Sequence, residues 1–217
     1  MRVTDNSFRP VTISADGRRV VFNAVLERQS QLFSRSIDSL DAQPISGTEN
    51  ASRTHTLSPD GQWIAFIDQS DSMLKKVPVT GGISVTLCDP AGTVWSMAWG
   101  ASGDIVYVTE TYAGLMRVSS SGGLPEEMTS PDPDEFHKQP NFSLDGNTLL
   151  FTIGERGTTT RKSDRLRALS LATGEQKVLM AGAAAKDLPD GYLVYFELNA
   201  LWAVEFDADR LEVTGRR

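Results

Sequence analysis

The sequence predicts an all-β protein, a β-propeller of five four-stranded antiparallel blades. A turn of the Ser/Pro-Asp-Gly type, followed at once by a short apolar strand, occurs five times, with its glycines at residues 17, 61, 103, 146 and 191. Their separations of 44, 42, 43 and 45 residues match the roughly 40–45 residues of a propeller blade. No segment shows helical periodicity for longer than a turn or two.

The repeat runs from one end of the 217 residues to the other, which predicts a single domain over residues 1–217. We expect its blades at residues 6–48, 49–90, 91–131, 132–180 and 181–217. The third turn is degenerate, because Gly103 precedes Asp104 instead of following an aspartate.

The second repeat shows how a blade is built. Strands are expected at residues 53–57, 63–67, 73–79 and 84–87. Between the first two, Pro59 sets φ, the Asp60 carboxylate accepts nearby backbone N–H groups, and Gly61 adopts positive φ. The repeated aspartates Asp16, Asp60, Asp145 and Asp190 are therefore interpreted as turn formers and not as catalytic carboxylates.

The second and third strands of the repeats differ in pattern. Residues 63–67 and 105–108 are almost continuously apolar, whereas third strands such as 114–118 alternate between apolar and polar residues. A strand covered on both faces needs apolar residues on both, so the second strands are expected between neighbouring sheets. A two-sheet sandwich would expose one face of every strand.

Composition excludes several functional classes. The formal net charge of -7 argues against a nucleic-acid-binding surface, and no stretch is apolar enough to insert in a membrane. Cys88 is the sole cysteine and is expected to be a buried small hydrophobe. Residues 1–6 lack the apolar core of a signal peptide, so the chain as written is expected to be cytoplasmic, or periplasmic if it is part of a longer exported or receptor protein.

Three side chains near the starts of first strands are the candidate binding residues: His55, Trp95 and His137. We expect them at the mouth of the central channel. The two histidines have the chemistry to hold a metal or act as acid and base, but solvated polar residues in a wet channel explain them as well. Trp95, Met97 and Trp99 alternate along one strand and are expected to share one face, as core packing or as an aromatic platform.

Two charged segments are further candidate binding sites. The acidic loop at residues 131–135 has the carboxylates of a calcium site, but it lacks the glycine and spacing of a calcium loop, so a solvated loop is expected. A local basic patch is formed by Arg161, Lys162, Arg165 and Arg167 and is interpreted as a solvated strand edge or loop. No metal and no cofactor are expected.

The Ser-x-Asp-Gly turn leading into an apolar strand resembles the TolB-type propeller repeat, a relative of WD40 repeats. Residues 201–215 are similar to a sequence found in the propeller tails of bacterial receptor serine/threonine kinases. The resemblance implies a sensor or interaction domain. Kinase catalytic motifs are absent, and TolB-type propellers usually have six blades where this chain offers five.

We therefore expect a non-enzymatic scaffold or sensor module that binds a protein, peptide or glycan. The alternative is a propeller hydrolase of the glycosidase or lactonase type, or an accessory propeller of a serine peptidase. Neither terminus offers strands for completing a shared blade. Five blades thus either close by side-chain packing alone or form an open arc that self-associates as a homo-oligomer.

Overall fold

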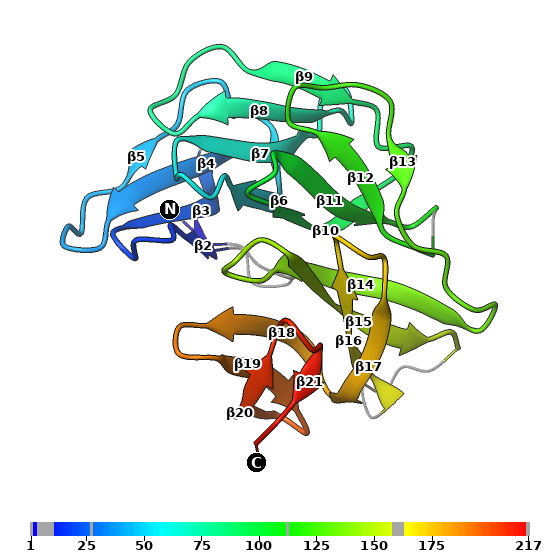
Figure 1. Ribbon diagram of the computed structural model, residues 1–217. Helices are drawn as coiled ribbons and strands as arrows, with labels where there is room; N and C mark the ends of the chain where they lie inside the picture. Colours follow the sequence, from blue (N-terminus) through cyan, green and yellow to red (C-terminus); the bar gives the residue numbers. More distant parts are fainter. Residues whose placement is uncertain (1, 4–10, 27, 112, 158–162, 216–217) are drawn as a thin grey trace. The chain divides into compact units, whose positions relative to one another are not determined.

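The computed structural model describes residues 2–3, 11–26, 28–111, 113–157 and 163–215. These residues form β-strands joined by turns and loops, and no α-helix occurs among them (Figure 1). None of them forms a helix long and apolar enough to cross a membrane. The chain divides into two compact units, the first made of residues 1–111 and 116–126 and the second of residues 112–115 and 127–217. A single domain over residues 1–217 stays a prediction.

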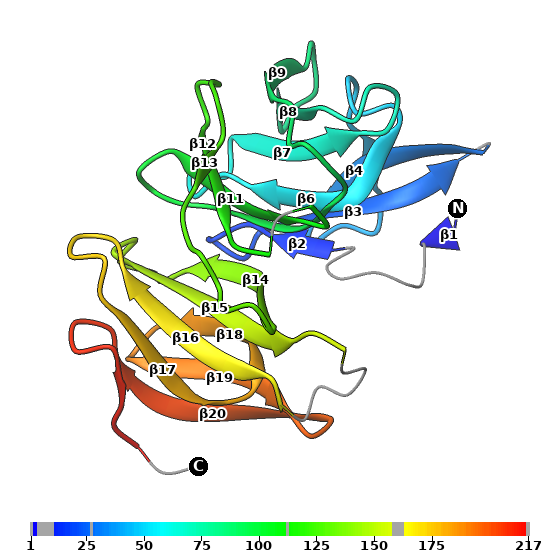
Figure 2. The same ribbon diagram turned by 90° about the vertical axis from the view of Figure 1, so that its right-hand side faces the viewer.

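Three antiparallel sheets fall in or mainly in the first unit (Figure 2). The first contains β1 (Arg2–Val3), β2 (Val11–Ile13), β3 (Arg19–Leu26), β4 (Gln29–Ser36) and β5 (Gln43–Pro44). The second contains β6 (Ala51–Leu57), β7 (Trp63–Asp68), β8 (Leu74–Pro78) and β9 (Val85–Cys88). The third contains β10 (Val94–Trp99), β11 (Asp104–Thr109), β12 (Met116–Ser119) and β13 (Glu126–Glu127).

Two antiparallel sheets form the second unit. The fourth sheet contains β14 (Glu135–Phe142), β15 (Thr148–Glu155), β16 (Arg165–Ser170) and β17 (Gln176–Ala181). The fifth contains β18 (Ala183–Leu188), β19 (Tyr192–Glu197), β20 (Ala200–Asp207) and β21 (Glu212–Val213).

The first sheet has five strands where four were expected. Both β1 and β2 pair with β3, and they do so one after the other: Val3 lies opposite Ala24, and Val11 lies opposite Phe22. Two short strands thus occupy the place that one first strand takes in the other sheets. The five-sheet architecture follows the repeat.

Neighbouring sheets pack face to face within each unit, as β7 illustrates. Ile64 and Phe66 belong to an apolar cluster shared with the first sheet, whereas Ala65 and Ile67 belong to a cluster shared with the third. Successive side chains of a strand point to opposite faces, so a strand between two sheets needs apolar residues at every position. This confirms the interpretation of the continuous apolar runs.

The repeated turn is a closed hydrogen-bond unit. In the second repeat Ser58 Oγ donates to Asp60 Oδ1 at 2.5 Å and accepts the Trp63 N–H at 2.9 Å, while Asp60 Oδ1 also accepts the Gln62 N–H at 3.0 Å. The first and fourth repeats make the same bonds. The hydrogen bonds from Ser58 and Gln62 lower the pKa of Asp60. The turn-former interpretation is confirmed for these three aspartates, since each carboxylate is bound to its own turn.

Candidate functional site

The first strand of each sheet from the second to the fifth is interrupted by a β-bulge. On β6, three residues, 52–54, lie opposite the single residue Ile67 of β7. On β10, Trp95 has no opposite residue, and on β14 and β18 residues 139–140 and 184–185 lie opposite the single residues Phe151 and Tyr195. A bulge re-aims side chains and is over-represented next to functional sites. Four repeats therefore place an irregular segment at corresponding positions.

His55 supports the bulge of β6. Its ring is buried, with 2% of the residue exposed. Nδ1 lies 3.0 Å from the carbonyl oxygen of Arg53 in the bulge, and Nε2 lies 3.4 Å from that of Val21 on β3. Burial lowers the pKa of His55, so the ring is neutral at pH 7. We assign its one proton to Nδ1, which makes the shorter contact.

Trp95 projects from the neighbouring bulge. Its exposed fraction is 49%, whereas Ser96 and Met97 after it are buried. The expectation that Trp95, Met97 and Trp99 share one face is wrong, because the bulge between Val94 and Ser96 breaks the two-residue alternation. Met97 and Trp99 pack with the core between the second and third sheets, and Trp95 does not belong to that cluster.

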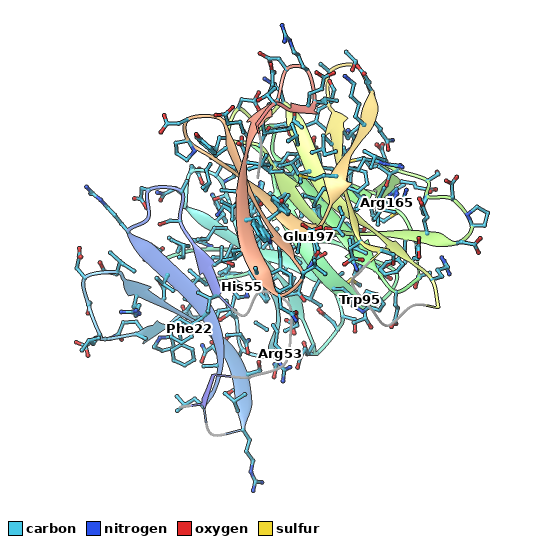
Figure 3. All side chains as sticks on the ribbon, turned by 90° about the horizontal axis from the view of Figure 1, so that it is seen from below. Phe22, Arg53, His55, Trp95, Arg165 and Glu197 are labelled. Atoms are coloured by element: carbon cyan, nitrogen blue, oxygen red, sulfur yellow. The ribbon has the colours of Figure 1, made fainter. Side chains whose placement is uncertain are left out.

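The two bulges are joined directly. Thr54 Oγ1 on β6 donates to the Val94 carbonyl oxygen on β10 at 3.1 Å. The first sheet also contacts the β6 bulge: Asn23 Nδ2 on β3 donates to the carbonyl oxygens of Ala51 and Ser52, at 3.0 and 3.2 Å. We call residues 52–54 and Trp95 the bulge surface; Figure 3 labels Arg53 and Trp95, which belong to it, and the buried His55. It is a fixed backbone frame that carries an exposed indole and a part-exposed guanidinium side chain.

His137 lies in the second unit and is also buried, with 1% exposed. Its Nδ1 lies 2.7 Å from Thr129 Oγ1, and its ring packs on Phe151 with 4.7 Å between ring centroids. Burial, and to a smaller extent the positive charge of Arg167, lowers the pKa of His137 to about 4. The interpretation of both histidines as solvated channel residues does not hold, because neighbouring side chains and backbone enclose them.

Charged side chains near β14 pair among themselves. Glu135, the last residue of the acidic loop, binds Arg165, and Lys138 Nζ lies 2.8 Å from Asp164 Oδ1. Arg167 Nη1 donates to Gln176 Oε1 at 3.3 Å, while Arg161 and Lys162 of the expected basic patch lie outside the described residues. Among the described residues, no three His, Cys, Asp or Glu side chains come together as metal ligands.

Sequence patterns did not locate the bulges. The Arg53 segment reads as a regular strand, and nothing in the chemistry of residues 94–96 marks the register shift at Trp95. One available signal was Pro140, because a proline inside a strand pattern favours a bulge or an edge. Thr54 and Asn23, which join the bulge segments across sheets, become evident only from the packing.

Comparisons with known proteins define the fold class. No protein-family model matches the sequence, and no curated protein matches it. Among solved structures, the chain is similar to TolB from Acinetobacter baumannii, with 13% identity, a TM-score of 0.72, and coverage of 91% of this chain and 51% of that one.

Two further structures have the same architecture. Oligogalacturonate lyase from Vibrio parahaemolyticus is 13% identical, with a TM-score of 0.67 and coverage of 95% of this chain and 64% of that one. A chain of a nidogen/laminin complex is 14% identical, with a TM-score of 0.67 and coverage of 90% and 74%. The chain thus spans 51 to 74% of these three structures. It has the TolB-like β-propeller fold, which confirms the predicted fold class.

Proposed function

We propose that this chain is a non-enzymatic binding module whose bulge surface contacts a protein partner. The observation that carries the proposal is Trp95, a tryptophan that is 49% exposed on a backbone held by Thr54 of β6 and paired with β11 on both sides of the bulge. Tryptophan and arginine are the residues enriched at the centres of protein interfaces, where a few anchors supply most of the binding energy. The nidogen/laminin complex supports a protein partner, since a similar propeller is part of it.

The roles within the site differ. Trp95 and Arg53 make the contacts, and His55 positions Arg53 by fixing its carbonyl oxygen. The buried His137 lies in the other unit, where it joins β14 to Thr129 in the preceding loop and packs on Phe151 of β15, so it acts on structure rather than on the partner. The residues proposed from the sequence thus divide into one contact residue and two supports.

Site-specific photo-crosslinking tests the proposal. A photoreactive residue replaces Trp95 in the full chain, which is expressed in its native host, and Ile83 carries the same group in the control. Ile83 is 90% exposed in the loop between β8 and β9. We expect one discrete protein adduct at position 95, absent at position 83 and reduced at least about tenfold by Arg53→Ala. Equal labelling at both positions would refute the site.

An enzymatic function is the alternative, because one similar structure is an oligogalacturonate lyase in complex with manganese. The described residues do not fit a resident metal, since no three ligand side chains gather among them. Incubation of the protein with oligogalacturonate and manganese is expected to give no unsaturated product above a blank without protein. Turnover would overturn the non-enzymatic proposal.

A further inference from the structure

Four of the five repeated turns contain an Asp-Gly bond, at residues 16–17, 60–61, 145–146 and 190–191. Such a bond can rearrange, because the backbone nitrogen of the glycine can attack the side-chain carboxyl carbon of the aspartate before it. Glycine has no Cβ to obstruct that attack. All four aspartates are exposed, so exposure does not distinguish them. The hydrogen bonds of their turns do.

Both reacting groups are hydrogen-bonded in three of the turns. In the second repeat, Asp60 Oδ1 accepts from Ser58 Oγ and from the Gln62 N–H, and the Gly61 N–H donates to the Ser58 carbonyl oxygen at 2.9 Å. The first and fourth repeats make the same three bonds, in which Gly17 and Gly146 donate at 2.9 and 3.0 Å. The attack therefore requires the carboxylate and the N–H group to give up these partners first.

The serine hydroxyls also keep the carboxyl groups ionised. The hydrogen bonds from Ser14 and Ser58 lower the pKa of Asp16 and of Asp60, respectively. A lower pKa leaves a smaller protonated fraction at neutral pH. The protonated form is the reactive one, because its OH group can leave as water, whereas the negative charge of a carboxylate repels the attacking electron pair.

The fifth turn lacks these bonds. Leu188 stands where the other turns have a serine, so the position offers no hydroxyl group. The turn is also tighter, since Leu188 pairs with Tyr192 and leaves only residues 189–191 between the strands. Within the described part of the chain, no hydrogen bond engages the Asp190 carboxylate or the Gly191 N–H. The two reacting groups thus have no competing partner among these residues.

The backbone of Asp190 adds a second difference. Its φ is 70°, in the left-handed region, whereas the aspartates of the other three turns do not have positive φ. This region is unfavourable for a residue that carries a Cβ. The rearrangement adds a methylene group to the main chain at this residue, so the product no longer has to adopt that conformation.

We propose that Asp190 is the site at which this protein forms isoaspartate. The Gly191 nitrogen bonds to Asp190 Cγ, and the carboxyl OH and the amide hydrogen leave together as water, which gives a five-membered succinimide. Water then opens the ring. Cleavage between the nitrogen and Cγ restores aspartate. Cleavage between the nitrogen and the main-chain carbonyl carbon routes the main chain through Cγ and frees the α-carboxylate. Nothing is oxidised or reduced.

The product defines the class of partner that would act on it. An isoaspartyl residue carries a free α-carboxylate, which is the group that a repair methyltransferase methylates with S-adenosylmethionine. Pro189, Asp190 and Gly191 are all exposed, so this carboxylate would be accessible without unfolding. The site lies in the second unit and does not rest on the bulge surface.

Ageing of the intact chain at neutral pH and body temperature tests the assignment. A purified isoaspartyl methyltransferase labels the product, and electron-transfer fragmentation of its peptides locates it. We expect isoaspartate to form at residue 190 at least about tenfold faster than at residues 16, 60 or 145, because hydrogen bonds to a charged group protect those three. Asp190→Glu should remove most of the label, and thermal unfolding verifies that this variant is folded.

Ser58→Ala is the matched variant, because it removes the hydroxyl that binds the Asp60 carboxylate. Isoaspartate at residue 60 should then form at least about fivefold faster, while residue 190 keeps its rate. In urea the four Asp-Gly bonds should react at similar rates, since all four turns are lost. Equal rates in the folded chain would overturn the proposal. A preference for residue 190 that persists in urea would do so as well, because it would come from the adjacent residues and not from the turn.

Discussion

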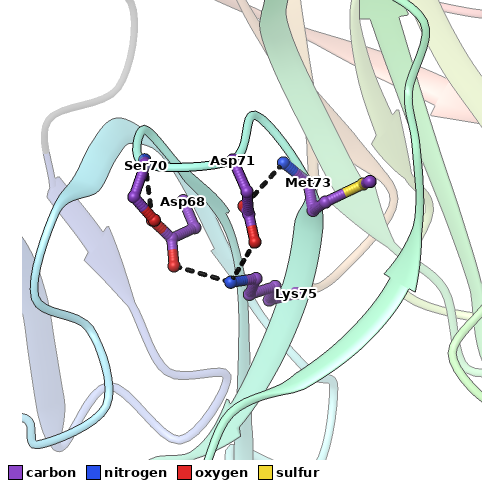
Figure 4. A network of polar contacts seen from close by, with 5 residues as sticks. All are labelled: Asp68, Ser70, Asp71, Met73 and Lys75. Carbon is purple, nitrogen blue, oxygen red and sulfur yellow. Dashed lines mark hydrogen bonds and ion pairs between the residues drawn. The ribbon is translucent and has the colours of Figure 1, made fainter.

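Lys75 and Asp68 form an ion pair across the loop between β7 and β8, with Nζ 2.7 Å from Oδ2 (Figure 4). Both side chains are nearly buried, and Asp71 supplies a second carboxylate 2.6 Å from the same Nζ. Asp68 Oδ1 also accepts the N–H and the hydroxyl of Ser70, at 2.9 and 2.6 Å. The network fixes a loop whose Ser72 has a φ of 62°.

Replacing Lys75 by methionine is expected to lower the free energy of unfolding by about 1.5–3 kcal/mol, because it leaves the nearly buried Asp68 carboxylate without its cation. Urea unfolding at pH 7 measures the loss. Lys177→Met is the control, since its ion pairs with Glu175 and Glu212 are largely exposed and are worth less than about 1 kcal/mol. Equal losses in both variants would contradict a special role for the Lys75 pair.

The same network makes the free energy of unfolding depend on pH in the acidic range. Burial by itself raises the pKa of Asp68, but the hydrogen bonds from Lys75 and Ser70 outweigh it and leave the pKa below 3.8. A depressed carboxyl pKa stabilises the fold above the unfolded value and loses that contribution as the pH falls through the folded value. The stability lost as the pH falls below about 4 should therefore be smaller in Lys75→Met than in the original chain.

Ser58→Ala tests the repeated turn. The substitution removes the hydroxyl that donates to Asp60 and accepts from Trp63, so we expect a loss of about 1–2 kcal/mol and a pKa of Asp60 nearer its usual value. Ser102→Ala in the degenerate third turn is the control, because its hydroxyl makes two solvent-exposed hydrogen bonds, one to the Asp104 carboxylate at 3.0 Å and a long one of 3.4 Å from the Asp104 N–H. Denaturant unfolding and carboxyl NMR titration measure the two effects. An unchanged Asp60 titration would refute the proposed origin of its pKa.

His137 should make the fold acid-sensitive between about pH 6.5 and pH 4. Its folded pKa of about 4 lies below the unfolded value, so the unfolded chain takes up the proton first as the pH falls. The stabilising effect of the neutral ring is complete above about pH 6.5 and declines toward pH 4. His137→Gln should flatten the dependence of the unfolding free energy on pH in that window. An imidazole NMR titration near pH 6.5 would contradict the buried, neutral ring.

Cys88 is expected to be unreactive in the folded protein. Burial raises the pKa of its thiol to about 11, and the side chain lies in the core between the second and third sheets. The thiolate is the reactive form, so a disulfide reagent at pH 8 should label Cys88 slowly in buffer and rapidly in urea. Fast labelling in buffer would show that this core opens.

Local patterns sufficed for the elements of the fold. The five turns and the apolar runs, such as Ile64 to Ile67, depend on neighbouring residues and on two-residue periodicity, and the structure keeps both. Patterns failed at Trp95 and at the two histidines. The placement of Trp95 depends on a register shift, that of His55 on Val21 of another sheet, and that of His137 on Thr129 and Phe151 in neighbouring segments.

Turn chemistry and strand periodicity are local properties of the chain, so the order of residues alone predicts a protein built from repeated antiparallel sheets. Which polar residues are buried and which tryptophans are exposed emerged only from the packing of the folded chain. Burial and exposure depend on which segments distant in sequence pair with the same backbone groups and cover the same apolar surface. The sequence of a single segment does not contain that information.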